Sequence, residues 1–378
     1  MKRVEVRTKE RPRKYEIRVG RELLAQVGSV IRNCVGKQAQ RVALVSNKRV
    51  YSLYGTVAHD SLSASDFDVR PCLIGDGESH KSIKTVHQIL NFFSESGLER
   101  SDCVVALGGG IVGDVAGFAA AVYLRGLPFI QLPTSLLAQV DSSVGGKTGV
   151  NLPTGKNLVG SFHQPVAVIA DIETLRTLPA RELVAGWCEC VKQGAVGNRK
   201  LFKETTDFLR SSRNNDGLIS SRLETLIAAH CAFKASIVAG DEREDPARSD
   251  HSSRRILNFG HTIAHALETV TRYRRFRHGE AVGQGMLVAG ELSKNLGLLD
   301  ETELELLREA VSLCGPLPSA RDLDERAVID AIAHDKKRTA GYVQWVLLER
   351  IGRPRIVAGK EISAALLAKS VRDVFHRS

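Results

Sequence analysis

Residues 103–122 constrain the fold most, because an apolar run, a glycine cluster and an alanine-rich segment follow one another there. The run Cys103–Leu107 predicts a buried strand, and Gly108, Gly110 and Gly113 form the spacing G-x-G-x-x-G. A strand, a glycine turn and a helix in this order bind pyrophosphate groups, because glycine lets the backbone approach the phosphates and the helix N-terminus donates N–H groups. The pattern therefore predicts α/β architecture and favours a dinucleotide ligand.

The glycine motif alone does not decide between a dinucleotide site and a tight turn without a ligand. An acidic residue about 20 positions further on would normally bind the ribose. Here residues 128–133 (PFIQLP) occupy that place and are predicted to form the next strand, with Thr134 and Ser135 at its end. Any ribose contact must therefore differ from that of an ordinary Rossmann domain.

The composition predicts a globular protein of two domains. The chain has 378 residues, of which 43% are hydrophobic, and domains average about 150 residues. No run approaches the ~20 apolar residues of a membrane span, and the basic N-terminus lacks the apolar core of a secretory signal. The seven cysteines show no disulfide spacing, which favours a reducing compartment. We expect a cytoplasmic protein without a membrane partner.

The net charge of +10 is compatible with nucleic acid, an acidic membrane surface or an anionic substrate. Two basic clusters lie at Arg11–Lys14 and Arg272–His278. No recognition motif accompanies them, and only 5% of residues are aromatic. We therefore expect a solvated basic surface and no nucleic-acid partner.

The alternation of strand and helix patterns ends near residue 178. We expect an α/β, Rossmann-like N-terminal domain with a mainly parallel sheet over residues 1–178 and an all-α C-terminal domain over residues 179–378. Helical periodicity continues beyond Pro179, and Gly240–Ser253 is predicted to be a polar loop. The individual predictions are strands at Val4–Arg7, Tyr15–Val19, Arg41–Ser46 and Asp68–Ile74 and a helix at Ser82–Gly97.

The helical half contains a polar stripe in an apolar segment. Arg254, Asn258, His261 and His265 follow one another at spacings of 4, 3 and 4, which predicts one face of a helix. Burying such groups without partners costs several kcal/mol. The stripe therefore indicates a wet cavity or a ligand, and a surface helix with a polar side is the alternative.

Histidines and one acid could form a metal site. His261 and His265 have the i, i+4 spacing of a metal pair. His278 begins the next predicted helix, and Glu189 is a candidate carboxylate ligand. Three N/O ligands with an open position are typical of catalytic zinc. The cysteines on either side of Glu189 point away from it on a helix and are interpreted as packing residues.

Cationic side chains could hold an anionic substrate. Lys147 and Lys156 lie among glycines and turns, where phosphate contacts are common. Arg254 could grip a carboxylate with two parallel hydrogen bonds. The candidates are Lys81, Arg125, Lys147, Lys156, Lys192, Lys234, Arg254, Lys336 and Lys337.

Taken together, the motifs resemble the 3-dehydroquinate synthase family. The segments that carry the resemblance are GDGESHKS, LGGGIVGDVAGFAAAVYLRG, PTSLLAQVDSSVGGKTGVN, GKNLVG, DERE, LNFGHTIAHALE, HGEAVGQGM and HDKK. They cover nearly the whole chain in the order of the family. Their joint specificity is far above that of any one glycine motif.

The resemblance implies a lyase of the shikimate pathway, which supplies chorismate and the aromatic amino acids. Such an enzyme converts 3-deoxy-D-arabino-heptulosonate 7-phosphate to 3-dehydroquinate and phosphate, through oxidation, β-elimination, reduction, ring opening and aldol closure. It implies catalytic NAD that is not consumed, a divalent metal (zinc or cobalt) and a homodimer.

The resemblance also implies a role for each matching residue. The metal ligands would be Glu189, His261 and His278. The NAD contacts would be Glu78, Lys81, Gly108, Gly109, Gly110, Asp114, Thr134, Ser135, Asp141, Lys147, Lys156, Thr174 and Thr177. The catalytic residues would be Asp141, Lys147, Lys192, Lys234, Asn258 and His265. The substrate contacts would be Lys147, Asn157, Lys234, Arg254, Asn258, His265, Lys336 and, across the dimer, Arg125.

The chain departs from the family pattern without losing an implied ligand. Ile263 and Ala264 stand where Phe-Gly is usual, Gln193 replaces an aromatic residue, and the loop before Arg254 is longer. Three alternatives compete with the synthase: an NAD- and metal-dependent polyol dehydrogenase, a related sugar-phosphate cyclase, and a basic binding protein on a degenerate enzyme fold. Arg254 favours the synthase, because cyclases acting on uncarboxylated sugar phosphates would not need it.

Overall fold

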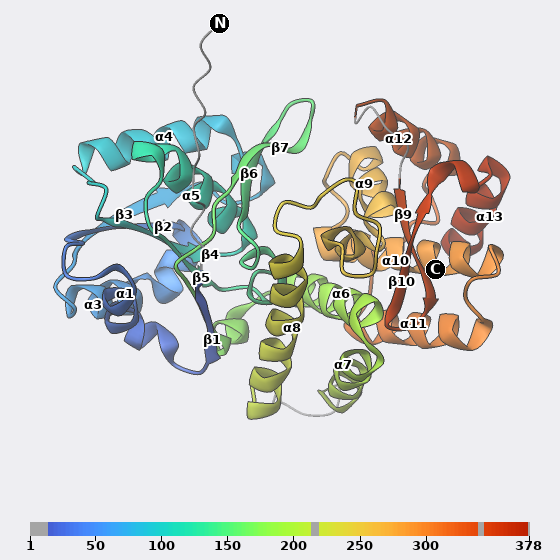
Figure 1. The fold of residues 1–378 in the computed structure, drawn as a ribbon, viewed down its shortest axis with the longest axis horizontal. Coiled ribbons are helices and arrows are strands. Elements are labelled where there is room, and N and C mark those ends of the chain that lie inside the picture. Colours follow the sequence, from blue (N-terminus) through green and yellow to red (C-terminus); the bar gives the residue numbers. More distant parts are fainter. Residues whose placement is uncertain (1–13, 213–218, 339–343, 377–378) are drawn as a thin grey trace, which may run out of the picture.

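A six-stranded, all-parallel sheet forms the centre of the N-terminal half (Figure 1), with strand order β1-β8-β5-β4-β2-β3. The computed structural model describes residues 14–212, 219–338 and 344–376. The strands are β1 (Glu16–Gly20), β2 (Arg41–Asn47), β3 (Asp68–Ile74), β4 (Cys103–Gly108), β5 (Phe129–Pro133) and β8 (Ala167–Asp171).

Helices cover both faces of this sheet, and β4 shows why. Its residues are all buried, with Val105 facing one core cluster and Val104 facing another. A parallel strand buried on both sides reads as a continuous apolar run. One cluster contains side chains of α1 (Val27–Val35) and α3 (Thr56–Ser63), and the other contains side chains of α4 (Ile83–Glu95) and α5 (Gly110–Val122).

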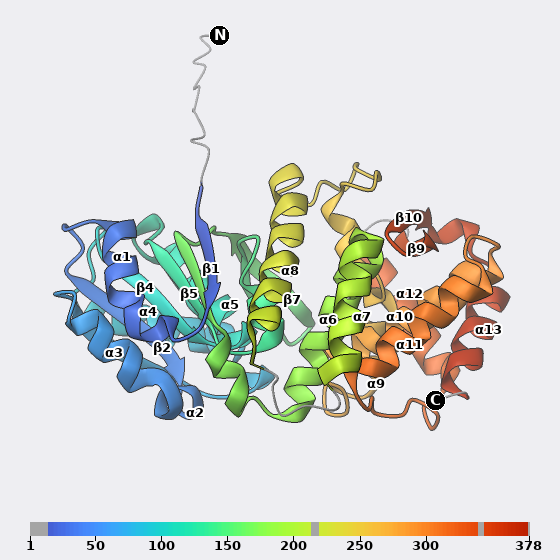
Figure 2. The ribbon, with the colours of Figure 1, turned by 90° about the horizontal axis from the view of Figure 1, so that it is seen from below.

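Long helices make up most of the C-terminal half. They are α6 (Ala180–Gly197), α7 (Arg199–Ser212), α8 (Ser221–Gly240), α9 (His261–Val270), α10 (His278–Asn295), α11 (Glu301–Cys314), α12 (Glu325–Arg338) and α13 (Ala364–Phe375). Figures 1 and 2 place α6 and α8 between the sheet and the remaining helices. The predicted fold class is confirmed, and the domain boundary at residue 178 stays a prediction.

The structure adds two antiparallel hairpins that the sequence patterns did not predict. One consists of β6 (Lys147–Leu152) and β7 (Gly155–Phe162) and projects from the sheet toward the helical half (Figure 1). The other consists of β9 (Gln344–Arg350) and β10 (Arg353–Ala358). The C-terminal half is therefore mainly but not exclusively α-helical.

The predicted elements agree with the structure within one or two residues over most of the N-terminal half. The helix expected at residues 82–97 is α4, and Ser82 caps it by accepting a hydrogen bond from the N–H of Thr85. The strand expected at Tyr15 begins at Glu16 and pairs in parallel with β8. Its expected neighbour, Val4–Arg7, lies outside the described residues.

The prediction of one continuous polar helix over residues 254–265 was wrong. Residues Arg254–Asn258 form a separate 3-10 turn, and α9 begins only at His261. Gly260 interrupts the helix with φ of 80°, a conformation that favours glycine. A Cβ atom there would lie 2.8 Å from the main-chain N of Met286 on α10, so close packing also requires glycine.

Within the described residues, α8 is the one helix that is long and apolar enough to cross a membrane by length and composition. Two of its polar residues are, however, bonded inside the protein. His230 is fully buried with Nδ1 3.1 Å from Oε1 of Gln193, and Lys234 bonds to Asp141. Packing between α6 and the sheet accounts for its apolar surface.

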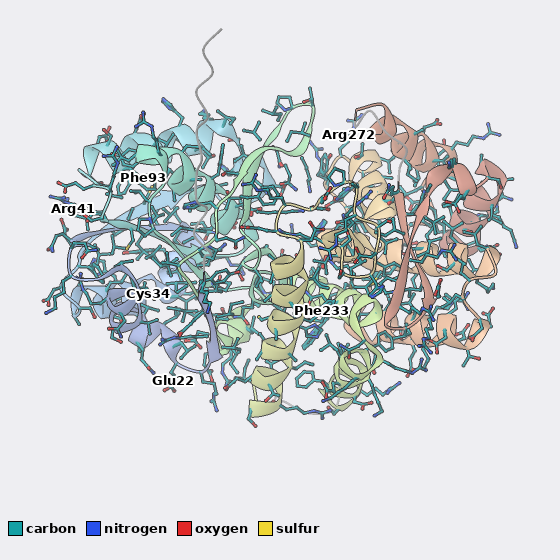
Figure 3. All side chains as sticks on the ribbon, viewed as in Figure 1. Glu22, Cys34, Arg41, Phe93, Phe233 and Arg272 are labelled. Carbon is teal, nitrogen blue, oxygen red and sulfur yellow. The ribbon has the colours of Figure 1, made fainter. Side chains whose placement is uncertain are left out.

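All seven cysteines are free. Cys34, labelled on α1 in Figure 3, is exposed, and the other six are buried. Cys188 and Cys190 have no exposed surface and belong to the apolar core around α6, in accord with their interpretation as packing residues.

Close approach to α10 depends on glycines along that helix. A Cβ at Gly279 would lie 1.9 Å from the carbonyl oxygen of Ala185 on α6. A Cβ at Gly285 would lie 2.0 Å from the carbonyl oxygen of Gly260, directly before α9. Backbone atoms cannot yield as side-chain ends do, so these two contacts set the spacing of α6, α9 and α10.

We expect Gly285→Ala to lower the free energy of unfolding by about 1–3 kcal/mol through overpacking. A matched control is Gly283→Ala on the same helix, whose Cβ would meet the movable end of Leu317 at 2.9 Å. Urea denaturation of both variants checks this. Equal stability of the two variants would contradict the proposed role of the backbone contact.

Candidate active site

Three helices bring Glu189, His261 and His278 together, with one ligand atom of each within 4.8 Å of the others. Glu189 lies in the middle of α6, while the two histidines begin α9 and α10. Glu189 has no exposed surface, and neither carboxylate oxygen makes a hydrogen bond, although the ammonium of Lys192 is in ion-pair contact with it. Nitrogen and oxygen donors in this number suit zinc, cobalt or iron, so the residues fit a divalent metal.

Each histidine of this group has one ring nitrogen turned away from the group. Nδ1 of His261 lies 3.3 Å from the carbonyl oxygen of Phe259. Nδ1 of His278 lies 3.3 Å from Oε1 of Glu268, and its Nε2 lies 3.8 Å from Oε1 of Glu189. Oxygen acceptors on the far nitrogen fix the ring orientation and the tautomer of metal-binding histidines. Both rings are thus oriented with Nε2 available to a metal.

Burial and the charge of Lys192 both favour the neutral form of His261. Burial is the main cause of the lowered pKa of His261, and the ammonium of Lys192 lowers it further. A neutral imidazole is the form that binds metals.

Asp141 balances two buried ammonium groups next to the metal ligands. Lys234 donates to Oδ1 and to the carbonyl oxygen of Asp141, both at 2.7 Å. Burial opposes the charge of Asp141, but Lys234 and Lys192 outweigh it and hold its pKa far below the ordinary value. Burial in turn lowers the pKa of Lys234, against the attraction of Asp141. Gln193 fixes this turn by donating to the carbonyl oxygen of Val140 at 2.9 Å.

A second polar group forms around Glu244. This residue is the last of the segment DERE and was not predicted as a site residue from the sequence. Its carboxylate accepts hydrogen bonds from Lys147 on β6 and from Nδ2 of Asn258, the latter at 2.8 Å. Burial would raise the pKa of Glu244, but Lys147 outweighs it and lowers the value. Arg254 is buried close by and donates through Nη1 to the carbonyl oxygen of Gly145 at 3.0 Å.

The glycine turn joins β4 to α5 as the motif predicted. Gly109 caps α5 without a side-chain hydrogen bond, so the first amides of the helix keep their donors. A Cβ at Gly108 would lie 2.6 Å from Cγ2 of Val112, and a Cβ at Gly110 would lie 2.9 Å from Oγ of Ser142. Larger residues at these two positions would collide with the protein's own side chains, so the tight turn requires glycine.

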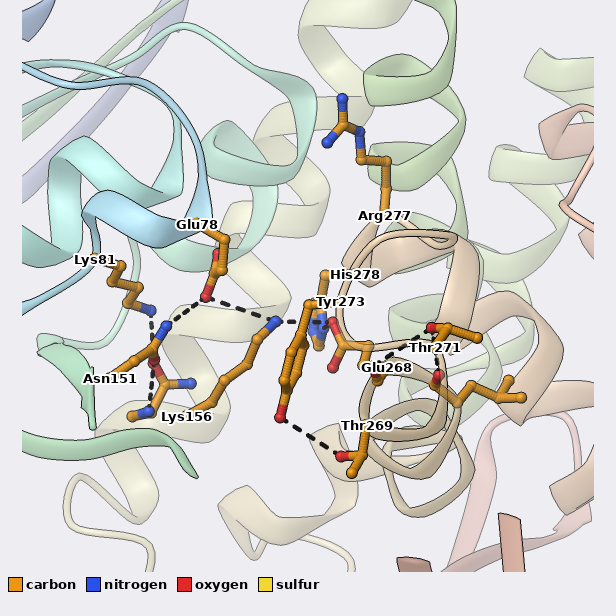
Figure 4. A network of polar contacts seen from close by, with 12 residues as sticks. Glu78, Lys81, Asn151, Lys156, Glu268, Thr269, Thr271, Tyr273, Arg277 and His278 are labelled. Carbon is orange, nitrogen blue, oxygen red and sulfur yellow. Dashed lines mark hydrogen bonds and ion pairs between the residues drawn. The ribbon is translucent and has the colours of Figure 1, made fainter. Parts of the chain in front are cut away.

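Polar side chains extend from this turn toward the hairpin. Lys81 donates to Oδ2 of Asp114 at 2.5 Å and to Oδ1 of Asn157 at 2.6 Å. Asn151 donates to Oε1 of Glu78 at 2.8 Å (Figure 4). Burial raises the pKa of Asp114, with Lys81 acting in the opposite direction. These residues lie together, as a shared ligand would require.

Three further residues predicted to contact NAD lie near the same edge. Lys156 extends from β7 and lies between Glu78 and Glu268 (Figure 4). Thr134 donates its N–H to the carbonyl oxygen of Gly108 at 3.0 Å, next to the turn. Ser135 accepts a hydrogen bond from the N–H of a residue three positions on.

The remaining predicted residues lie at varied distances from the metal ligands. His265 lies beside them, with its ring edge-on to that of His261 at 5.6 Å between centroids and stacked on that of His278 at 6.2 Å, but it is not part of the ligand group. The hydroxyls of Thr174 and Thr177 are bonded within the protein. Arg125 lines a separate cavity of about 520 Å³ together with residues 163–166. The side chain of Lys336, on the last turn of α12, lies outside the described residues.

Family models of the 3-dehydroquinate synthase N-terminal and C-terminal domains match residues 71–185 and 186–338. The chain belongs to the 3-dehydroquinate synthase family. A 3-dehydroquinate synthase of Pelotomaculum thermopropionicum is 42% identical over 352 residues, which cover 92% of this chain and 91% of that protein. The one of Rippkaea orientalis is 40% identical over 94% of both.

Solved structures agree with this membership of the 3-dehydroquinate synthase family. The 2-epi-5-epi-valiolone synthase of Streptomyces hygroscopicus with bound NAD+ and Zn2+ superposes with a TM-score of 0.86, at 25% identity over 99% of this chain and 100% of that one. A 2-deoxy-scyllo-inosose synthase with carbaglucose-6-phosphate, NAD+ and Co2+ gives 0.79, at 25% identity over 95% and 96%. A glycerol dehydrogenase of Schizosaccharomyces pombe gives 0.67 at 15% identity, over 97% and 91%, and shares the fold.

We expect Asp141→Asn to lower the free energy of unfolding by about 3–5 kcal/mol at pH 7, because it leaves the buried ammonium group of Lys234 without its charged partner. The folded-state pKa of Asp141 lies below that of the unfolded chain, about 3.9. Its stabilisation is thus present above that pH and is lost as the pH falls toward the folded-state pKa. The difference between wild type and variant should shrink by about 1 kcal/mol at pH 3.

Denaturation by urea at pH 7 and pH 3 measures both quantities. Asp207→Asn, which breaks the surface pair with Lys203, is the control and should change stability by less than about 1 kcal/mol. A difference between wild type and Asp141→Asn that is equal at both pH values would refute the assignment.

Proposed function

We propose that this member of the 3-dehydroquinate synthase family converts 3-deoxy-D-arabino-heptulosonate 7-phosphate to 3-dehydroquinate and phosphate, without net oxidation. The observation that carries the proposal is the group of buried Glu189 and partly buried His261 and His278, with two ammonium groups beside it. The curated relatives at 40–42% identity bear the name of this activity. The phosphate leaves by elimination, which makes the enzyme a lyase of the shikimate pathway.

Glu189, His261 and His278 would hold a divalent metal, zinc or cobalt, and the glycine turn at residues 108–110 would hold NAD. When bound, NAD supplies a transient oxidation of one substrate carbon, and the metal polarises substrate oxygens. Oε1 of Glu189, which is buried and has no hydrogen-bond partner, supports the first assignment. The order of strand β4, glycine turn and helix α5 supports the second.

The side chains of the protein would bind and orient the substrate. Lys192 and Lys234 offset negative charge that develops on substrate oxygens, and Asp141 keeps Lys234 aligned. Lys147 and Asn258 both donate to the carboxylate of Glu244. Each could exchange this partner for hydroxyl or phosphate oxygens of the substrate. Fixing the phosphate beside the reacting carbon lowers the entropic barrier to its departure.

Arg254 favours a substrate with a carboxylate over other cyclase substrates. Its Nη1 group is bonded to main-chain oxygens, which fixes the guanidinium plane in a buried position. A fixed, planar guanidinium suits a carboxylate. A related sugar-phosphate cyclase acting on uncarboxylated substrates is the second candidate, supported by the likeness to two such enzymes.

The first experiment is an assay of phosphate release from 3-deoxy-D-arabino-heptulosonate 7-phosphate with NAD and Zn2+, while absorbance at 340 nm is followed in parallel. We expect steady release without net NADH, loss of activity after EDTA treatment and recovery with Zn2+ or Co2+. Glu189→Gln should reduce turnover by at least about a hundredfold, because it removes the charged ligand of the metal.

The other outcomes distinguish the competing functions. Steady accumulation of NADH would identify a dehydrogenase. Turnover of sedoheptulose 7-phosphate alone would identify another cyclase. Salt-dependent binding of nucleic acid without any turnover would identify a binding protein on a degenerate enzyme fold.

We also propose that the protein is a cytoplasmic homodimer in which Arg125 reaches the phosphate of the partner's substrate. Arg125 and the preceding Leu124 have φ of 69° and 47°, a strained conformation that persists where function or packing requires it. Exposed apolar side chains lie around this turn and on the hairpin at Val122, Leu124, Leu158 and Phe162. Such side chains suit an interface with a second copy.

Mixing two inactive variants tests the shared site. Neither Arg125→Met nor Glu189→Gln should be active alone. If each site uses one residue from each subunit, the mixture regains up to about one quarter of wild-type activity, because half of all dimers are mixed and each mixed dimer carries one intact site out of two. No recovery in mixed dimers, isolated through a different affinity tag on each variant, would contradict the proposal.

A further inference from the structure

Glu268 is a buried carboxylate at the end of α9 that none of the roles above uses. Only 2% of its surface is exposed. Oε1 accepts a hydrogen bond from Lys156 at 3.1 Å and lies 3.3 Å from Nδ1 of His278, as Figure 4 shows. A single carboxylate oxygen thus contacts both the outer nitrogen of a metal ligand and a lysine from the other half of the chain.

Lys156 is held at this position from several sides. It extends from β7, and Nζ also lies 3.6 Å from Oε1 of Glu78. The ring of Tyr273 lies over it, with 4.5 Å between Nζ and the ring centroid. A cation over an aromatic face is attracted to the ring. The lysine therefore joins the N-terminal half to the loop between α9 and α10.

The backbone around Tyr273 is strained in a way that serves this contact. Arg272 and Tyr273 are consecutive left-handed residues, with φ of 51° and 57°. Such conformations are costly for residues other than glycine and persist where the surrounding structure requires them. The N–H of Tyr273 donates to the carbonyl oxygen of Glu268 at 2.7 Å, so the same turn places the ring and closes α9.

The contacts continue without a break toward the glycine turn. Glu78 accepts from Asn151, Asn151 accepts from the N–H of Asn157, and Asn157 accepts from Lys81, which bonds to Asp114 on α5. A chain of polar contacts thus runs from the helix that follows the glycine turn to a metal ligand. A ligand that orders the side chains at one end of this chain of contacts would therefore also restrict the motion of the side chains at the other end.

We propose that Glu268 is a positioning residue that couples the metal site to the dinucleotide site, an inference that rests on the proposed function. It fixes the ring of His278 so that Nε2 faces the metal, and it anchors Lys156 beside Glu78. Metal binding would then preorganise the dinucleotide site, and NAD would tighten the metal by the same factor, because binding coupling is reciprocal.

A structural role alone would not explain this arrangement. Buried ion pairs add little to stability compared with apolar residues of the same size. Acceptors on the outer nitrogen of metal-binding histidines raise metal affinity by about 10–100-fold. The position of Oε1 between His278 and Lys156 therefore points to ligand binding.

Isothermal titration with the full-length protein tests the coupling. NAD affinity is measured after EDTA treatment and again with Co2+, and Co2+ affinity is measured with and without NAD. In wild type each ligand should tighten the other by about tenfold, within the usual range of binding coupling. The visible spectrum of bound Co2+ reports the geometry of the ligands independently of activity.

Three variants separate the two contacts of Glu268. Glu268→Gln keeps an acceptor for His278 but loses the charge that attracts Lys156, so it should bind Co2+ better than Glu268→Ala and show no coupling. Lys156→Met should retain the wild-type Co2+ affinity and spectrum and also lose the coupling. Glu291→Gln, a buried carboxylate farther along α10, is the matched control and should retain both affinities and the coupling.

The results distinguish this inference from the proposed function. Coupling that survives in Lys156→Met, or wild-type Co2+ affinity in Glu268→Ala, would overturn the inference while leaving the synthase activity in place. A wild-type protein that binds neither Co2+ nor NAD would overturn the proposed function first. Thermal melting of every variant confirms that each is folded before titration.

Discussion

A fully buried carboxylate without a hydrogen bond, that of Glu189, is the constraint on which the helical half depends. Such a charge is expensive in an apolar core unless cations approach it. Lys192 does so one turn along the same helix, and two histidines face it from α9 and α10. These neighbours can converge only because α10 packs against backbone atoms at Gly279 and Gly285. The spacing of the helices therefore determines whether these side chains can form the site.

Polar contacts carry the geometry from the helices to the sheet. The β6–β7 hairpin belongs to the N-terminal half, yet Lys147 and Lys156 end on carboxylates of the helical half. Apolar burial also joins the two halves, because Leu136, Val140 and Ile172 of the N-terminal half belong to the same core cluster as the helices. Directional, charge-assisted contacts add to this packing and fix the orientation of the hairpin against the helical half.

Local patterns predicted the sheet and the glycine turn well, because a buried parallel strand or a tight turn depends mainly on the types of a few consecutive residues. The prediction of a continuous polar helix was wrong at Gly260. The spacing of side chains does not show where a residue must be small to avoid a neighbouring backbone. Glu244 and Glu268 were missed for a related reason. Their lysine partners are 97 and 112 positions away in the sequence, so only the resemblance to a family, and not periodicity, could have linked these regions.

The order of strands in the sheet has a consequence for the growing chain. β1 is the first strand of the described sequence, but its partner is β8, and they meet only after residues 167–171 exist. Synthesis proceeds at about 5–20 residues per second, and domains fold as units during it. The ~150 residues that separate the two strands take about 8–30 seconds to synthesise, and β1 lacks its partner during this time. Position in the sequence and time of incorporation into the sheet are thus uncoupled in this protein.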